Sequence, residues 1–202
     1  MSVEIGRNYL VGSRLHYDKE ELFYSAREQT KRVWPDIPVY LSELEILWRG
    51  RKWMGLKRIL SSVDAVGVLA HWGVDHPRIE DISVFLDECQ GLGLPVYIEH
   101  LTIAESEYFA PKHLHSLLWN EVLMKRYSEL FELFERRSDV VKRVTLGGLH
   151  DGCSWHRQHL PYAWPHLWDE VLEAKPVVYS LLALAKRLKE ERVKFVSLLV
   201  KD

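Results

Sequence analysis

The stretch GLGLPVYIEHLTI, residues 91–103, decides the fold class. Gly91 and Gly93 end a helical pattern, and Pro95 cannot continue it. The run from Pro95 to Ile103 is rich in apolar and β-branched residues, which is typical of a buried strand in a parallel sheet. This stretch therefore predicts a helix, a short turn and a buried strand.

Three other runs have the same composition and are bounded by turn residues. They are Val39–Ile46, Ala65–Trp72 and Val141–Leu149. Helical patterns lie before, between and after the four runs, at Lys19–Val33, Met54–Leu60, Ile79–Gln90, Lys112–Arg137 and Lys175–Arg192. Repeated strand–helix units favour right-handed crossovers in a parallel sheet, either doubly wound or a (β/α) barrel. We therefore predict an α/β protein with four parallel strands.

The composition indicates a globular protein. The 202 residues are 47% hydrophobic and 28% charged, which suits a single domain over residues 1–202 with a sizeable core. With 27 basic and 29 acidic residues, the chain has no excess of positive charge to attract a nucleic acid. No glycine-rich phosphate loop follows a strand, which argues against a bound dinucleotide.

The sequence also bears on localisation. It has no apolar stretch of about 18 residues that would span a membrane, and its N-terminus does not have the pattern of a leader peptide. As written, it predicts a cytoplasmic protein with no membrane partner. Cys89 and Cys153 lie far apart and predict neither a disulfide framework nor a zinc ribbon.

Three segments, in order, resemble glycoside hydrolase family 10, the endo-1,4-β-xylanases. Residues 91–98, GLGLPVYI, resemble the family's GLPVYITELD strand. Residues 143–155, RVTLGGLHDGCSW, resemble its RVTFWGLTDxxSW strand, and residues 168–179 resemble its closing segment. Looser matches extend the resemblance to residues 19–184, so that 1–18 and 187–202 stay unassigned. It implies a four-stranded half-barrel, strands five to eight of a (β/α)₈ TIM barrel.

The family's first four strands have no counterpart in this resemblance. A (β/α)₈ barrel takes about 250 residues and closes, so a half-barrel would leave two strand edges and one sheet face open. Three alternatives stay open: a gene fragment or decayed gene, a homodimer, and a separately encoded N-terminal half-barrel as partner. The family is usually exported, so a lost first half would also have carried the leader.

Both glutamates of the family's reaction are missing from the resemblance. Retaining glycosidases need two carboxyl groups about 5 Å apart. His100 stands at the nucleophile position, and the strand of the general acid/base has no counterpart. Glu99 precedes His100, but alternating strand side chains should point to opposite faces, so we expect Glu99 to be a weak substitute.

Four residues match positions that the resemblance assigns to the sugar-binding end of the family's cleft: His71, Asp151, Ser154 and Trp155. Gly147 stands where the family has a tryptophan platform for the sugar. We therefore predict a carbohydrate-active protein of the xylanase type, an O-glycosyl hydrolase by descent whose catalysis is impaired. Its partner would be a xylan-type polysaccharide or oligosaccharide. The alternative is a non-catalytic sugar-binding or assembly module.

The same substitutions bring a second alternative, a metal site. We expect no cofactor, with zinc as the alternative. His71, His100 and His150 would lie at the carboxyl ends of three neighbouring strands. Three imidazoles are the ligand set of an open catalytic zinc site, and Asp151 or Glu99 would then orient the ligating rings.

Overall fold

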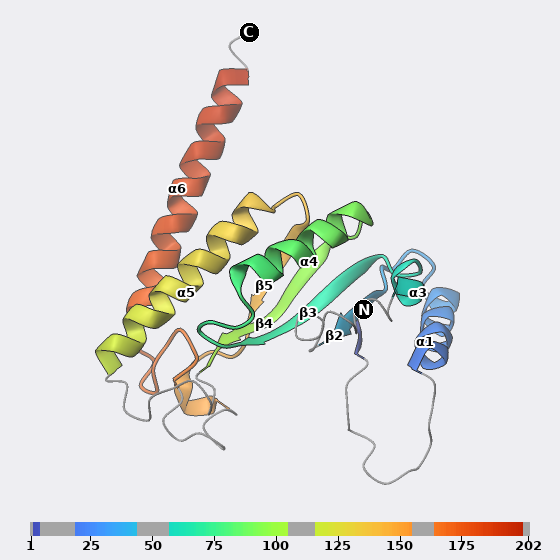
Figure 1. The fold of residues 1–202 in the computed structure, drawn as a ribbon, viewed down its shortest axis with the longest axis horizontal. Coiled ribbons are helices and arrows are strands. Elements are labelled where there is room, and N and C mark those ends of the chain that lie inside the picture. Colours follow the sequence, from blue (N-terminus) through green and yellow to red (C-terminus); the bar gives the residue numbers. More distant parts are fainter. Residues whose placement is uncertain (1, 5–18, 44–56, 105–115, 155–163, 200–202) are drawn as a thin grey trace. The chain divides into compact units, whose positions relative to one another are not determined.

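The structure, a computed structural model, describes residues 2–4, 19–43, 57–104, 116–154 and 164–199 (Figure 1). Its strands are β1 Ser2–Glu4, β2 Tyr40–Glu43, β3 Ala65–Trp72, β4 Val96–Ile103 and β5 Val141–Leu146. Its helices are α1 Lys19–Val33, α3 Lys57–Leu60, α4 Ile79–Gly91, α5 Ser116–Arg136 and α6 Pro176–Leu199, with a 3-10 turn, η1, at Asp151–Cys153. Strands and helices thus alternate along the described chain.

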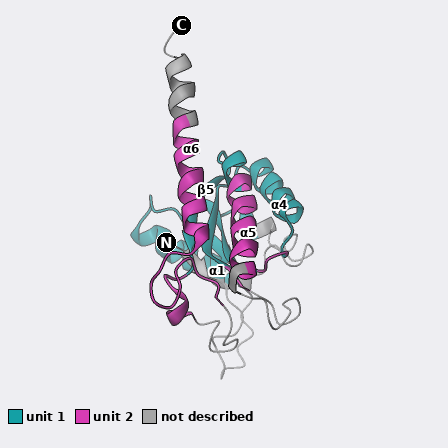
Figure 2. Cartoon of the chain, turned by 90° about the vertical axis from the view of Figure 1, so that its left-hand side faces the viewer, with its two compact units in different colours: residues 1–72, 76–102, 134–147 teal, residues 73–75, 103–133, 148–202 magenta. Residues whose placement is uncertain are grey.

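The chain divides into two compact units, which Figure 2 draws in different colours. Unit 1 comprises residues 1–72, 76–102 and 134–147, and unit 2 comprises residues 73–75, 103–133 and 148–202. The units alternate along the sequence, so no single position separates them. The expectation of one domain over residues 1–202 stays a prediction.

The strands form one sheet in the order β1-β2-β3-β4-β5. The pairs β1–β2, β2–β3 and β4–β5 are parallel. This confirms the predicted α/β class with four parallel strands. The sheet has β1 as a fifth strand, which the sequence did not reveal because three residues are too few to show a periodicity.

The core of unit 1 lies on one face of the sheet. In β3, Val66, Val68 and Ala70 are fully buried, whereas Leu69 and His71, which alternate with them, are half-buried. Helix α4 buries an amphipathic stripe of its own, formed by Ile82, Phe85, Leu86 and Cys89. Strand β3 therefore has an apolar face and a second face, which carries Gly67, Leu69 and His71. We call this second face the Gly67 face.

Several element ends differ from the prediction. Strand β5 ends at Leu146, three residues before the predicted Leu149, because Gly147 and Gly148 follow and Gly148 has a φ of 88°. Helix α6 continues to Leu199, beyond the predicted Arg192. Residues 44–46 of the first predicted strand and 54–56 of the second predicted helix lie outside the described residues.

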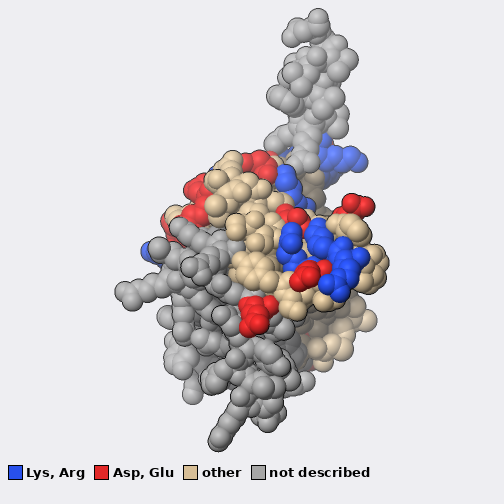
Figure 3. Space-filling view, turned by 90° about the vertical axis from the view of Figure 1, so that its right-hand side faces the viewer, with Lys and Arg blue, Asp and Glu red and all other residues tan. Residues whose placement is uncertain are grey.

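The described surface carries charges of both signs. On the face drawn in Figure 3, acidic side chains lie beside the basic ones. In unit 1, Arg32 of α1 pairs with Glu28, and Lys31 pairs with Asp64. Within the described part of the chain, no helix is long and apolar enough to cross a membrane. The expectations on nucleic acid and localisation stay predictions.

Candidate functional site

A polar cluster surrounds the carboxylate of Glu99 in unit 1. The hydroxyl of Tyr40 donates to Oε1 at 2.8 Å, and the hydroxyl of Ser42 donates to Oε2 at 2.7 Å. A guanidinium nitrogen of Arg143 lies 3.2 Å from Oε1. We call these four residues the Glu99 cluster. Both carboxylate oxygens have partners, so Glu99 is held in one position.

The Glu99 cluster lies in the interior of unit 1. The space for the carboxylate comes from Gly67, since a Cβ there would lie 2.8 Å from Oε2 of Glu99. Gly67 is the third residue of β3, and the Glu99 side chain is only 13% exposed. Tyr40 and Ser42 are buried as well. Glu99 is therefore an interior residue with little access to a large ligand.

A β-bulge in β4 contains Glu99 and His100. Ile98 pairs with Val144, whereas the next pair joins Leu101 and Leu146, so β4 contains one residue more than β5. His100 has a φ of 52° in this bulge. The bulge interrupts the regular alternation of side chains along β4, on which the expectation about Glu99 and His100 rested.

The bulge places His100 on the same face as Glu99. The rings of His100 and His71 stack, with centroids 6.4 Å apart and an interplanar angle of 29°. His71 lies four residues after Gly67 in β3 and therefore lies on the Gly67 face. The expectation that Glu99 and His100 point to opposite faces is therefore wrong.

We call His71 and His100 the imidazole pair. At roughly 3.3 Å per residue, His71 lies about 13 Å beyond Gly67, near the carboxyl end of β3, where (β/α) barrels carry their functional side chains. His100 is exposed and His71 is half-buried. Burial lowers the pKa of His71, and the charge of His100 adds to this effect. His71, near the carboxyl end of β3, and His100, the fifth of the eight residues of β4, thus place imidazoles where the nucleophilic carboxylate was expected.

The expectation of a three-histidine zinc site stays a prediction. Among the described residues, which include His71, His100 and His150, no group of three His, Cys, Asp or Glu could hold a metal ion. Within unit 1, the rings of His71 and His100 stack. His150 belongs to unit 2, where its Nδ1 accepts a hydrogen bond from the N–H of Gly152 at the start of η1. We do not propose a zinc site.

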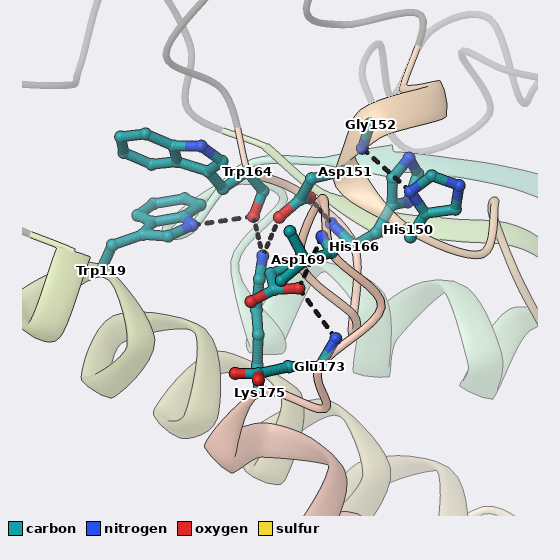
Figure 4. Close-up of polar contacts among 10 residues, drawn as sticks. Trp119, His150, Asp151, Gly152, Trp164, His166, Asp169, Glu173 and Lys175 are labelled. Carbon is teal, nitrogen blue, oxygen red and sulfur yellow. Dashed lines mark hydrogen bonds and ion pairs between the residues drawn. The ribbon is translucent and has the colours of Figure 1, made fainter.

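A second polar cluster surrounds Asp151 in unit 2 (Figure 4). Asp151 is fully buried, and its Oδ1 accepts a hydrogen bond of 2.9 Å from the N–H of His166. Its Oδ2 lies 2.6 Å from Nζ of Lys175. The carbonyl of Trp164 accepts hydrogen bonds from Nζ of Lys175 and from the indole N–H of Trp119. We call Asp151, Trp164, His166 and Lys175 the Asp151 cluster.

The Asp151 cluster joins three segments of unit 2. Asp151 opens η1, Trp164 and His166 lie in the next described segment, and Lys175 precedes α6. Burial lowers the pKa of Lys175, while the Asp151 carboxylate opposes that shift. Near Lys175, Asp169 accepts hydrogen bonds from two backbone N–H groups. These contacts indicate that Asp151 holds the loop after β5.

The residues that the sequence predicted to contact a sugar lie in different environments. Asp151 has its oxygens turned into the protein, which does not favour a direct contact with a sugar. Ser154 is buried at the end of η1. Trp155 lies outside the described residues. Sugar binding by these three residues stays a prediction, and His71 is the predicted residue that the structure places at the end of a strand.

The sequence reasoning missed several residues of these clusters. Tyr40 and Ser42 stand two apart in a predicted strand, a spacing that places both on one face. Lys175 lies in the closing segment that carried the resemblance. Nothing in the sequence pairs Arg143 with Glu99. In addition, Glu4 of β1 stands in register with Ser42, which adds an acidic residue to the row of Ser42 and Gly67.

Comparisons with known proteins agree with the resemblance. A family profile described as "Glycosyl hydrolase family 10" matches residues 49–184. An endo-1,4-beta-xylanase of Geobacillus stearothermophilus is 28% identical over 127 residues, which cover 59% of this chain and 38% of that protein. Endo-1,4-beta-xylanase A of Caldicellulosiruptor saccharolyticus is 26% identical over 196 residues, which cover 90% of this chain and 50% of that protein. The chain thus spans half or less of these relatives.

Solved structures show the same relationship at the level of the fold. The structure of GH10 from Paenibacillus barcinonensis matches with a TM-score of 0.73 at 22% identity, over 85% of this chain and 52% of that one. Xylanase 10B from Thermotoga petrophila RKU-1 in complex with xylobiose matches with a TM-score of 0.71 at 18% identity, over 86% and 52%. These neighbours are TIM barrels, so the predicted half-barrel fold is confirmed.

Proposed function

Because the chain belongs to glycosyl hydrolase family 10, we propose that it binds xylan-type sugar chains at the imidazole pair of β3 and β4 without hydrolysing them. The imidazole pair carries the proposal. Imidazole rings can donate hydrogen bonds to sugar hydroxyls, and His100 is exposed to solvent. The binding part of the proposal rests on the family and on xylanase relatives such as the two named above.

The loss of hydrolysis rests on the positions of Glu99 and His100. A retaining glycosidase needs a carboxylate that reaches the anomeric carbon, with a second carboxyl group about 5 Å away. Glu99 is the acidic residue adjacent to the bulge, but its oxygens are bonded to Tyr40, Ser42 and Arg143. A protonated His100 would oppose the positive charge that develops on the sugar in the transition state. These contacts of Glu99 support the proposed loss of hydrolysis.

Two measurements on the full chain test this function. Release of reducing sugar from xylan should be absent, and calorimetry with xylotriose should detect binding that is weakened at least threefold in His100→Ala. Hydrolysis that disappears in Glu99→Gln would overturn the loss of catalysis and assign the reaction to Glu99. Absence of heat with millimolar xylotriose would overturn sugar binding.

A second candidate function is assembly into a larger barrel. Strand β5 is the edge of the sheet, and Lys142, Arg143, Thr145 and Leu146 are all exposed on it. An open strand edge pairs readily with another chain. Sedimentation of the purified chain distinguishes a homodimer from a chain that pairs with a complementary half-barrel. A dimer would favour pairing of two copies, and a monomer that binds a separately produced N-terminal half of a relative's barrel would favour the complementary half.

A further inference from the structure

The backbone of His100 is held in an unusual conformation. Its φ of 52° lies in the left-handed region, which costs free energy for a residue that carries a β-carbon. The bulge places two residues of β4, Glu99 and His100, opposite one residue of β5, Thr145. A strained conformation of this kind persists only where surrounding contacts hold it. The contacts on either side of His100 therefore decide whether its imidazole stays exposed.

On the carboxyl side of the bulge, the carbonyl of His100 is held. The hydroxyl of Thr102 donates to this carbonyl at 3.0 Å and lies 3.3 Å from the carbonyl of Gly147. The N–H of Gly147 donates to the carbonyl of Leu101 at 3.0 Å, which resumes the pairing of β4 with β5. These contacts are between neutral groups and fix one end of the two-residue bulge.

On the amino side of the bulge, the carboxylate of Glu99 is held. Its oxygens accept hydrogen bonds from the hydroxyls of Tyr40 and Ser42, and a guanidinium nitrogen of Arg143 donates to Oε1 at 3.2 Å. The Glu99 side chain is largely buried, so moving it out of this cluster would break all of these hydrogen bonds. Because Glu99 directly precedes His100, its anchored side chain limits where the extra residue of β4 can lie.

Arg143 supplies the positive charge of this arrangement, and it belongs to β5, the strand on the other side of the bulge. The nitrogen that bonds to Glu99 also donates to the hydroxyl of Tyr40 at 3.2 Å. Its Cζ lies 4.6 Å from the centre of the Tyr97 ring, and Tyr97 is its partner in the register of β4 and β5. Hydrogen bonds between charged groups are stronger than neutral ones. Arg143 therefore connects β5 to the anchored end of the bulge.

We propose that Arg143 is a positioning residue for His100. Through its ion pair with Glu99, it keeps the extra residue of β4 at positions 99 and 100, with His100 in the left-handed conformation and its imidazole exposed. Arg143 acts through Glu99 and makes no contact with a ligand in this role. The consequence for sugar binding rests on the proposed function, whereas the conformation of His100 does not.

NMR spectroscopy of the full chain tests the conformation of His100 directly. At a positive φ the amide and α protons of one residue lie close together, so the NOE between them is strong, whereas it is weak in an extended strand. We expect a strong NOE for His100 in the original protein. It should become weak in Arg143→Met and in Arg143→Gln, which keeps a polar side chain on the exposed edge. Because one nitrogen makes both polar contacts, Arg143→Lys should keep the NOE strong.

A matched control separates the ion pair from the overall charge of the strand. Lys142 is an exposed cation on β5 that bonds to the carbonyl of Ser138, so Lys142→Gln removes one charge without touching Glu99. It should leave the NOE of His100 strong. A strong NOE in Arg143→Met and Arg143→Gln would overturn the proposal, and so would a loss of equal size in Lys142→Gln.

Calorimetry with xylotriose on the same proteins adds the functional consequence. Binding should weaken at least threefold in Arg143→Met and Arg143→Gln and stay unchanged in Lys142→Gln. An NOE that is lost without weaker binding would overturn the link between the bulge and the sugar. Absence of binding to the original protein would overturn the proposed function, and a loss of the NOE in Arg143→Met would then still support the positioning of His100.

Discussion

The carboxylate of Glu99 occupies the space that a side chain on Gly67 would need. A Cβ at position 67 would lie 2.8 Å from Oε2 of Glu99 and 2.9 Å from Oγ of Ser42. Both distances are shorter than real carbon–oxygen contacts. The glycine in β3 and the hydrogen bonds of the Glu99 cluster therefore depend on each other, and one substitution can test the whole arrangement.

Gly67→Ala should destabilise the protein by about 1–3 kcal/mol, the usual cost of adding a methyl group to a filled interior. The added carbon would push the carboxylate away from Ser42. Urea unfolding should show a lower midpoint with an unchanged slope. Gly91→Ala is the matched control, because a Cβ there meets nothing within 4 Å. Unchanged stability in Gly67→Ala would contradict the position of Glu99.

Lys175→Met should cost about 3–5 kcal/mol, because it leaves the fully buried Asp151 carboxylate without its cation. The double variant Lys175→Met with Asp151→Leu should be more stable than the single variant, since no unpaired charge remains buried. Arg32→Met is the control: it breaks an exposed pair with Glu28 and should change stability by less than about 1 kcal/mol. Equal losses at Lys175 and Arg32 would show that Asp151 is not buried with Lys175.

Much of the fold was predictable because it depends on local periodicity. The bounds of α1 and β3 match the predicted Lys19–Val33 and Ala65–Trp72. In each case a turn or a proline marks an end, and the buried positions repeat with the period of the element. Strand β1 was not predictable, because its assignment rests on pairing with Tyr40–Ser42 rather than on its own three residues.

The site was less predictable because it depends on contacts between strands. The bulge at His100 arises because two residues of β4 stand opposite one residue of β5. The sequence of β4 alone does not contain this information. Arg143 and Glu99 are 44 residues apart, and only the register of β4 and β5 brings them together. The resemblance identified His71 and His100 as residues of interest, but alternation alone gave the wrong relation between Glu99 and His100.

The depressed pKa of His71 predicts a dependence of stability on pH. Burial, with a contribution from the charge of His100, holds this pKa below the 6.5 of an unfolded chain. Between the folded and unfolded values the unfolded chain binds more protons, so the free energy of unfolding rises with pH. Stability from His71 is therefore complete above pH 6.5 and is lost as the pH falls below it.

His71→Gln should remove this component of the pH dependence. Urea unfolding at pH 7.5 and pH 5.5 measures it as the difference between the two free energies, taken for the original protein and for the variant. The difference should be smaller in His71→Gln. It should also shrink in His100→Gln, because the second contribution to the lowered pKa is then gone. An identical difference in all three proteins would contradict the burial of His71 beside His100.

Gly147→Ala should be more destabilising than Gly67→Ala. A Cβ on Gly147 would lie 2.5 Å from the carbonyl oxygen of His100 and would also collide with the hydroxyl of Thr102. At Gly67 the obstacles are side-chain atoms, whereas at Gly147 one obstacle is backbone in a bulge, which cannot move without breaking the pairing of β4 with β5. We expect a loss at or above the upper end of about 1–3 kcal/mol in urea unfolding.

Removing the second obstacle distinguishes the two causes of this loss. Gly147→Ala combined with Thr102→Ala should recover only part of the stability, measured relative to Thr102→Ala alone, because the carbonyl of His100 stays in place. Complete recovery would show that the hydroxyl of Thr102 is the whole obstacle. Partial recovery would mean that the bulge carrying His100 also prevents a tryptophan at position 147, so that one backbone feature both exposes the imidazole of His100 and excludes an aromatic platform.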